Sequence, residues 1–353
     1  MMTINDREEK TNIKNNETID NLLGEMKFEE EPDITKVIEQ KINQRIRKIA
    51  LKTVLCVLLV LALIFLGISP VMNTIYTDPV GLNSDVQVDE DAQTYRQSTL
   101  FNTLDAWIET QCPYCELDYV DIEKEGFAKY TIKAHIFDLK DSIWVGAAPN
   151  AVFRMARGKM SIEQDPTGML SMRCNVLSKG REEDIKEDRD LIEGLPASTR
   201  VCAVIHTKSP MDIVELRDNT NDDLYVDWVE VFNSGSDFKG GINLRHVLGT
   251  EPETKIRTMN STELKEYYIS RLQLLVDNQD IWGDLGISYS EENAMWISNT
   301  AEPILEAIDN LRSSDSFETE YFCVSGTRDE LLKYMDSHDF AGVNLISAKL
   351  ATN

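Results

Sequence analysis

The distribution of apolar and polar positions divides the chain near residue 50. From Thr53 to Ile68 the sequence reads TVLCVLLVLALIFLGI, without a charged side chain. Such a run, extended by Ala50–Leu51 and Val71–Met72, is long enough to cross a hydrocarbon core of about 30 Å as a helix. It begins too far along the chain for a signal peptide, and as a buried helix it would need protein on every side. The pattern therefore predicts one uncleaved transmembrane helix over residues 50–72.

Apolar positions before this run recur with helical spacing. Ile19, Leu22, Leu23 and Met26 fall on one face of a short helix. A second stripe follows Pro32, a residue favoured at helix starts, and leads into the apolar run; it comprises Ile34, Val37, Ile38, Ile42, Ile46 and Ile49. Such helices either lie on the membrane surface or bind a partner with an apolar groove. We expect residues 1–49 to form a helical tail with one of these two roles.

The region after the apolar run is expected to be α+β. Residues 73–95 lack a periodic pattern and read as a linker, followed by a helix over 98–108 and strands over 130–139 and 142–147. The densely charged run 179–190 predicts a subdomain boundary or a solvated loop.

A clearer pattern follows the charged run. It contains a strand over 201–207, a short helix opened by Ser209 and Pro210, a strand over 224–232, and helices over 261–278 and 301–313. The last three elements are a strand over 321–327, a helix and a strand over 342–350. Two strand–helix–strand units at opposite ends predict a ferredoxin-like split βαβ sheet with inserted helices. We expect a β-rich subdomain over 96–190 and an α+β domain over 191–353.

Charge sets the expected orientation. Five basic residues crowd the N-terminal flank of the apolar run, at positions 41, 45, 47, 48 and 52, whereas none follows the run before Arg96. The positive-inside rule therefore places the N-terminus in the cytoplasm and the large domain outside the cell membrane. The formal net charge of −25 makes direct nucleic-acid binding a poor fit.

Cys112-Pro-Tyr-Cys115 is the sharpest local motif. It resembles the active-site motif of glutaredoxins, in which a helix N-terminus activates the first thiol. Here the expected helix precedes the motif, and ELDYVDIEKEGF after it carries several acids and no clear helix. Cys112 and Cys115 are thus candidates for a structural disulfide ahead of redox catalysis, while Cys202 and Cys323 fit buried thiols in apolar strands.

Few other residues suggest chemistry. The tail contains neither His nor Cys, which excludes a zinc-built module there, and the four histidines are scattered. No group of residues amounts to a catalytic site, so we expect no enzyme activity, metal or cofactor. The alternatives left open are an extracytoplasmic binding or assembly module with the tail as an anchor, and a membrane-tethered thiol oxidoreductase.

Several of these segments together resemble the membrane-anchored sigma-factor regulators of Gram-positive bacteria. Phe28-Glu-Glu-Glu-Pro-Asp-Ile34, continuing through KVIEQKINQRIRK, is similar to the N-terminal region of that family. Leu195-Pro-Ala-Ser-Thr199, VCAVIHTKSPMDIVEL, LYVDWVEVF with its Trp, and YFCVSGTRDELLKYMDSHDFAGVNL resemble its C-terminal domain.

The resemblance implies an anti-sigma factor. The tail would sequester an extracytoplasmic-function sigma factor, and the outer domain would sense the state of the envelope or dock a second membrane protein. The contacts that it implies are apolar side chains of the tail: Leu22, Leu23, Ile34, Val37, Ile38 and Ile42.

Overall fold

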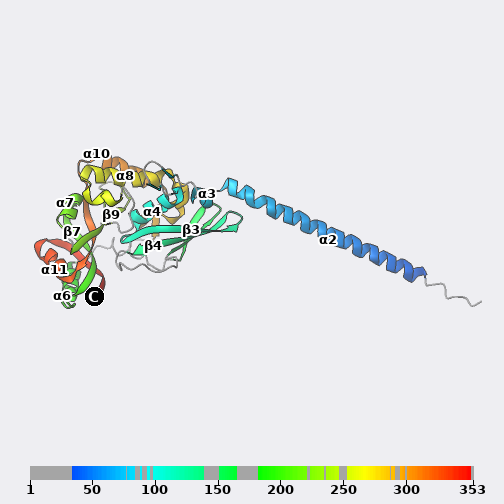
Figure 1. Ribbon diagram of the computed structural model, residues 1–353, viewed down its shortest axis with the longest axis horizontal. Helices are drawn as coiled ribbons and strands as arrows, with labels where there is room; N and C mark the ends of the chain where they lie inside the picture. Colours follow the sequence, from blue (N-terminus) through cyan, green and yellow to red (C-terminus); the bar gives the residue numbers. More distant parts are fainter. Residues whose placement is uncertain are drawn as a thin grey trace, which may run out of the picture. The chain divides into compact units, whose positions relative to one another are not determined.

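The computed structural model separates the chain into two compact units, Met1–Gly67 and Ile68–Asn353, each of which is described by itself (Figure 1). The residues described are 34–76, 78–83, 88–89, 94–95, 98–138, 151–164, 182–220, 223–233, 236–245, 253–286, 288–290, 295–298 and 300–350. The expected helix around Leu22 and Leu23 and the expected strand over 142–147 lie outside these residues.

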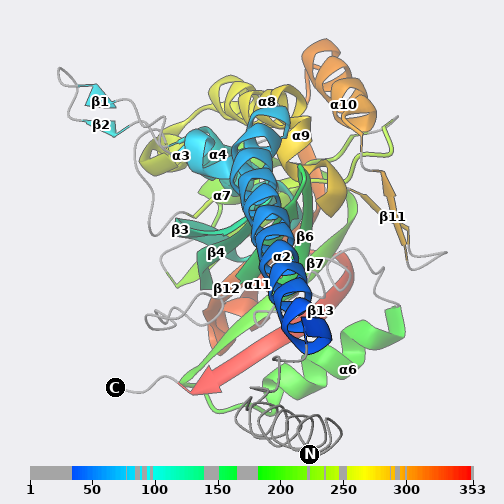
Figure 2. The ribbon, with the colours of Figure 1, turned by 90° about the vertical axis from the view of Figure 1, so that its right-hand side faces the viewer.

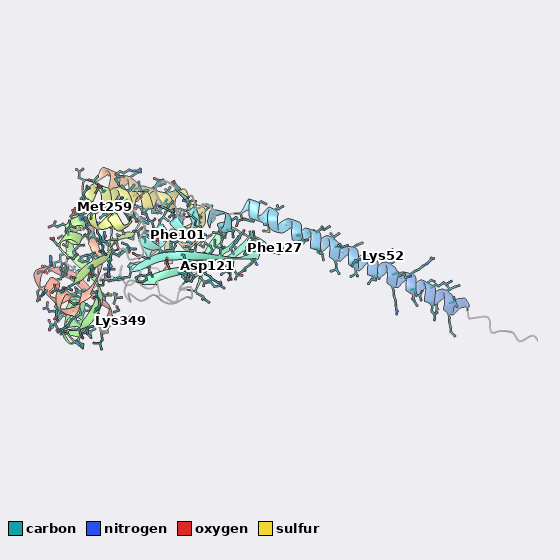
Figure 3. The ribbon with its side chains drawn as sticks, viewed as in Figure 1. Lys52, Phe101, Asp121, Phe127, Met259 and Lys349 are labelled. Carbon is teal, nitrogen blue, oxygen red and sulfur yellow. The ribbon has the colours of Figure 1, made fainter. Side chains whose placement is uncertain are left out.

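The longest helix, α2, runs without interruption from Ile34 to Ile75 (Figures 1 and 2). It joins the predicted stripe and the predicted span into one element of 42 residues. Its stretch Lys36–Ile68 is long and apolar enough to cross a membrane, and is the one such helix among the described residues. Lys52, labelled in Figure 3, is the last charged residue before the apolar run.

Short elements follow α2 within the predicted linker. They are the helix α3 (Pro79–Asn83) and the antiparallel strands β1 (Val88–Asp89) and β2 (Thr94–Tyr95).

A four-stranded antiparallel sheet comes next, packed against helix α4 (Thr99–Gln111). Ser98 caps α4 because its hydroxyl oxygen accepts a hydrogen bond from the backbone amide of Phe101, as expected for a helix that starts there. The strands lie in the order β3-β4-β5-β6, with bounds Cys115–Gly126, Lys129–Asp138, Ala151–Ala156 and Lys159–Gln164.

Strand β3 was not predicted, although its side chains alternate between partly buried and exposed positions from Asp118 to Glu123. Asp121, Glu123 and Glu125 occupy exposed positions, and the dense charge of the segment obscures the period-two pattern. The β3–β4 turn at Phe127 and Ala128 has positive φ at both residues, a conformation that matches the twist of a tight hairpin (Figure 3).

A five-stranded antiparallel sheet dominates the C-terminal half, in the order β13-β7-β12-β8-β9. The strands are β7 (Thr199–Asp212), β8 (Leu224–Glu230), β9 (Gly241–Asn243), β12 (Glu318–Thr327) and β13 (Phe340–Leu350). Helix α7 (Ile213–Asp218) joins β7 to β8, and α11 (Arg328–Ser337) joins β12 to β13. Strand β12 lies between β7 and β8, so these two connected strands are not neighbours.

The predicted start of α7 is wrong. Strand β7 continues through Ser209 and Pro210. The N-cap of α7 is Asp212, whose carboxylate accepts hydrogen bonds from the backbone amides of Val214 and Glu215. Pro210 is tolerated in the strand because the β7–β12 register is irregular opposite Thr319 and Tyr321.

The segment between β8 and β12 is mainly helical. It contains η1 (Glu253–Thr258), α8 (Ser261–Asp277), α9 (Gln279–Trp282), η2 (Gly283–Leu285), the paired strands β10 (Ser288–Ser290) and β11 (Met295–Ser298), and α10 (Glu302–Ser313). Asn260 and Glu263 form a capping box that fixes the start of α8, which was predicted at the same place.

The charged run 179–190 is helical over its described part, so the predicted loop is wrong there. Helix α6 spans Glu182–Glu193 and packs beside β13 (Figure 2). Glu, Lys and Arg are good helix formers, and the fully buried Ile192 anchors the helix. Arg189 adds an ion pair of 2.8 Å to Glu193 and one of 2.7 Å to Asp336 on α11.

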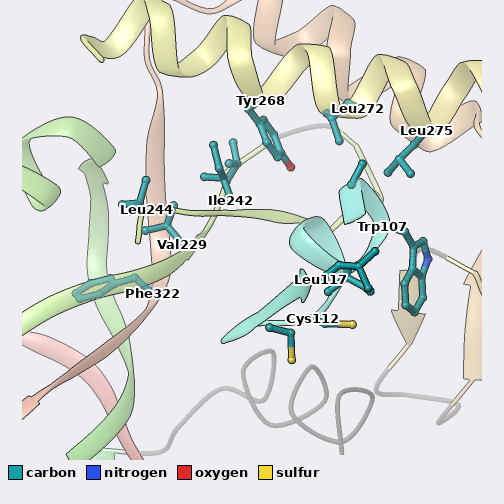
Figure 4. Packing of buried hydrophobic residues seen from close by; sticks show 14 of the residues in the cluster. Trp107, Cys112, Leu117, Val229, Ile242, Leu244, Tyr268, Leu272, Leu275 and Phe322 are labelled. Carbon is teal, nitrogen blue, oxygen red and sulfur yellow. The ribbon is translucent and has the colours of Figure 1, made fainter. Parts of the chain in front are cut away.

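The core of the C-terminal unit is continuous from the first sheet to the second. Tyr268, Leu272 and Leu275 of α8 lie in one cluster with Trp107 of α4 and Ile242 of β9 (Figure 4). The predicted parts 96–190 and 191–353 therefore share apolar packing within one compact unit.

Candidate functional site

The first candidate surface is the isoleucine stripe of α2, which we define as Ile38, Ile42, Ile46 and Ile49. These side chains are 50%, 50%, 57% and 64% exposed, and Val37 beside them is 39% exposed. Spacings of three and four residues place them on one face of the helix. Ile34 begins α2, whereas Leu22 and Leu23 lie outside the described residues. The role of Leu22, Leu23, Ile34, Val37, Ile38 and Ile42 in partner binding stays a prediction.

The helix passes from the stripe into its apolar part without a break. The Thr53 hydroxyl donates to the Ile49 carbonyl oxygen at 3.0 Å. This bond satisfies the first polar side chain of the apolar run within the helix, as a hydrocarbon environment requires. The stripe and the apolar run therefore belong to one continuous helix.

The second candidate is the Cys112–Cys115 turn, which connects α4 to β3. The Cys112 amide ends α4 by donating to Ile108 O at 2.7 Å, and the Cys115 amide donates back to Cys112 O at 3.2 Å. Tyr114 has φ of 64°, a conformation that costs energy for a residue with a side chain. Such strain persists only where the surroundings hold the residue in place.

Tyr114 is held by the five-stranded sheet. Its ring is fully buried, and its hydroxyl lies 2.9 Å from Ala203 O and 3.0 Å from Val324 O. Irregular register in β13 opposite β7, and in β12 opposite β8, occurs beside these two carbonyl groups. The bulges disrupt the ladder locally and allow the hydroxyl to reach backbone acceptors.

The environment of Tyr114 keeps it a neutral donor. Burial, and then the neighbouring Cys323 and Cys202 side chains, raise the pKa of Tyr114 well above its ordinary value. Tyr114, Cys202 and Cys323 share an apolar cluster with Trp228 and Phe137. The turn is thus a fixed contact that joins the first sheet to one face of the second.

The thiol groups of the turn are enclosed. Cys112 and Cys115 are 0% and 2% exposed and are thiols rather than a disulfide in the structure. Cys112 lies at the C-terminal end of α4, where the helix dipole disfavours a thiolate. This is the reverse of the glutaredoxin arrangement, in which the first thiol lies at a helix N-terminus. The burial and position of Cys112 therefore disfavour thiol exchange with a protein substrate. A disulfide between Cys112 and Cys115 stays a prediction. Cys202 and Cys323 are buried in their strands, as expected.

Asp227 on β8 is a buried acid that the sequence reasoning missed. It is 0% exposed, and its Oδ1 lies 3.2 Å from Nη1 of Arg245, which also bonds to Ser325 and stacks 4.3 Å over the Tyr225 ring. Its Oδ2 has no hydrogen-bond partner in the described part of the chain. Burial raises the pKa of Asp227 to about 6, although Ser325 and Arg245 oppose the shift. An acid inside the apolar run LYVDWVEVF was the available signal.

A second buried ionic group joins α4 to α8. Arg271 donates to Glu109 at 2.7 Å and also bonds to Asp105, two acids spaced one helical turn apart. Trp228, the Trp noted in the sequence, donates from Nε1 to the Glu109 backbone oxygen at 2.8 Å. These bonds tie β8, α4 and α8 together, which is a structural role.

Among the described residues, no group of three or more His, Cys, Asp or Glu is placed to hold a metal ion. No family model, curated protein or solved structure matches the chain.

Proposed function

We propose that this chain is a membrane-anchored anti-sigma factor. Its N-terminal tail binds an extracytoplasmic-function sigma factor in the cytoplasm, and its C-terminal unit lies on the other side of the cell membrane. The observation that carries the proposal is the uninterrupted course of α2 through both the isoleucine stripe and the apolar run.

The length of α2 lets the stripe project from the bilayer, starting at Ile49 directly beside the span. About 20 residues suffice to cross the hydrocarbon core. The 19 residues from Ile34 to Lys52 then add roughly 28 Å of the same helix at 1.5 Å per residue. A helix lying on the membrane surface needs a bend before the span, and α2 is continuous there. Its stripe consequently extends into water, where uncovered isoleucines are unfavourable and a partner surface is favourable.

The charges around the span support the orientation. Residues 34–52 carry six basic and one acidic side chain, whereas the first basic residue after the span is Arg96. Cytoplasmic flanks are enriched in Lys and Arg, which favours a cytoplasmic tail. The sigma factor is the partner that the sequence resemblance implies for such a tail.

The strand order supports the proposed resemblance of the C-terminal half to the C-terminal domain of sigma-factor regulators. With β7, β8, β12 and β13 counted as strands one to four, their order in the sheet is four-one-three-two, and β9 extends the edge. We infer a ferredoxin-like split βαβ sheet in which the segment from β9 to α10 is the insertion. In this proposal the C-terminal unit senses the envelope or docks a second membrane protein, without catalysis.

Crosslinking in membranes of the source organism tests the proposal on the full chain. The wild-type chain should capture a sigma factor, and the Ile38→Asp, Ile42→Asp double variant should lose it. The Gln40→Asp, Gln44→Asp double variant places the same charges on the opposite face of α2 and should retain it.

If all three chains capture the sigma factor equally, the isoleucine stripe is not the contact face. If no sigma factor is captured by a chain shown to reach the membrane intact, the chain is instead an extracytoplasmic binding module with a simple anchor.

A further inference from the structure

A row of basic side chains runs along α2 beside the isoleucine stripe. This row, which we call the basic row, comprises Lys41, Arg45, Lys48 and Lys52, and all four residues are exposed. Successive members are three or four residues apart, a spacing that places them on one face of a helix. Lys52, labelled in Figure 3, is the member next to the apolar run. The row therefore forms one continuous positive surface that ends at the proposed membrane span.

The basic row has no counter-ion within α2. Glu39 is the one acidic residue between Ile34 and Ile75. Ion pairs on a helix surface join residues that are three or four positions apart, and Glu39 has neither spacing to any member of the row. The positive charges of the row are therefore available to a ligand that approaches α2 from outside.

The end of the basic row nearest the span lies at the depth of the lipid headgroups. A rise of 1.5 Å per residue places Lys48 about 6 Å and Arg45 about 10 Å from Lys52 along the helix axis. The polar layer on each side of the hydrocarbon core is roughly 5–8 Å thick. Long basic side chains extend toward the headgroups, which brings Arg45 within reach as well. Three members of the row can thus contact the same headgroup layer, whereas Lys41 lies beyond it.

Anionic headgroups are the occupant that this position favours. A helix that crosses the membrane has to pass through the headgroup layer, so phosphate groups surround α2 at the depth of Lys48 and Lys52. Lys and Arg bind phosphate oxygens through charge-assisted hydrogen bonds, and clusters of basic residues beside a span attract anionic lipids. A second copy of α2 would bring a row of the same charge and would be repelled. The charge and the depth of the row therefore both fit a lipid.

We propose that Arg45, Lys48 and Lys52 form a binding site for the headgroup of an anionic phospholipid in the cytoplasmic leaflet. This inference rests on the proposed function for the orientation of the chain and adds a ligand to it. The site leaves the isoleucine stripe uncovered, because Ile46 and Ile49 each directly follow a member of the row and one residue advances about 100° around a helix. The lipid and the sigma factor therefore bind different faces of α2, and the lipid fixes the depth at which the stripe leaves the membrane.

Native mass spectrometry of the full-length chain, released from nanodiscs that contain equal amounts of phosphatidylglycerol and phosphatidylcholine, tests the lipid site. The wild type should retain mainly phosphatidylglycerol. Lys48→Gln should lower this preference about fivefold, because one basic side chain near an anionic surface contributes about 1 kcal/mol. Arg47→Gln is the matched control, since it removes the same charge at the adjacent position but on a face turned away from Arg45 and Lys52. It should keep the preference of the wild type.

Equal retention of the two lipids by the wild type would overturn the lipid site. Equal losses in Lys48→Gln and Arg47→Gln would also overturn it, because the attraction would then come from the overall charge of the tail rather than from the basic row. Neither measurement involves a sigma factor. Loss of the lipid site therefore leaves the proposed function intact, and the crosslinking in membranes decides that function separately.

Discussion

Isoleucines occupy opposite environments in the two units. Ile42 on α2 is 50% exposed, whereas Ile205 and Ile242 in the five-stranded sheet are fully buried. Burial of an isoleucine contributes on the order of 1.5–3 kcal/mol to folding. The C-terminal unit thus uses its apolar side chains for stability. The stripe of α2 gives little stability to its own unit, so its apolar surface remains available for binding.

The same contrast applies to charge. In the C-terminal unit, Arg271 and Asp227 are buried in specific ionic contacts. On α2 the basic residues are exposed around the stripe. Substitutions in the first region should therefore change folding, and substitutions in the second should change binding with little effect on folding.

The largest effect on folding is expected at Arg271. The Arg271→Met substitution leaves Asp105 and Glu109 close together and poorly solvated, which should cost about 3–5 kcal/mol of unfolding free energy. Denaturant unfolding of the full chain in detergent measures the loss. Lys333→Met removes a cation whose side chain is 72% exposed and should have no measurable effect. Equal effects of the two substitutions would contradict the structural role of Arg271.

Asp227 should make stability depend on pH. Its pKa rises from 3.8 to about 6 in the folded unit, so the folded state binds this proton more tightly than the unfolded state. The group stabilises the fold below about pH 4, and this contribution is lost as the pH rises through about 6, by up to roughly 3 kcal/mol.

Unfolding of the wild type and of Asp227→Asn at a series of pH values isolates this contribution. The unfolding free energy of the wild type minus that of the variant should decrease between about pH 4 and pH 7. A difference that rises over this range would show that the Asp227 carboxylate is stabilised rather than penalised by its surroundings.

A smaller effect is expected at the Cys112–Cys115 turn. Tyr114→Phe keeps the ring but removes the hydroxyl that bonds to Ala203 O and Val324 O. The loss should be about 1–2 kcal/mol, because buried carbonyl groups lose a donor. Tyr119→Phe, at a residue that is 41% exposed, is the matched control. A Tyr114→Phe chain as stable as the control would mean that the hydroxyl does not fasten the turn to the sheet.

The regular elements were predictable where one physical signal dominated. α2, α4, α8 and the four long strands of the second sheet follow from periodicity and caps, whereas the short strand β9 was not predicted. β3 was not predicted because its dense charge obscures the alternation, and α6 was not predicted because a densely charged run is typical of subdomain boundaries and solvated loops as well as of exposed helices. Both errors concern surface residues, which carry little information about the core.

The candidate site was only partly predictable. The stripe follows from spacing alone, but its continuity with the apolar run is a property of the folded helix. The Cys-Pro-Tyr-Cys motif drew attention to its thiols, whereas the structure makes Tyr114 the anchor between the two sheets. Contacts between residues 89 and 210 positions apart cannot be inferred from local pattern.

The most direct test of the central claim is transcription from a promoter of the captured sigma factor, measured in cells that carry each chain at equal membrane levels. The Ile38→Asp, Ile42→Asp substitutions should weaken the contact by at least about 3 kcal/mol, or roughly 100-fold in affinity, and should raise transcription. The Gln40→Asp, Gln44→Asp chain should keep transcription low. If the stripe variant represses as well as the wild type, the isoleucine stripe is not the contact, and if the wild type itself does not repress, the anti-sigma account is wrong.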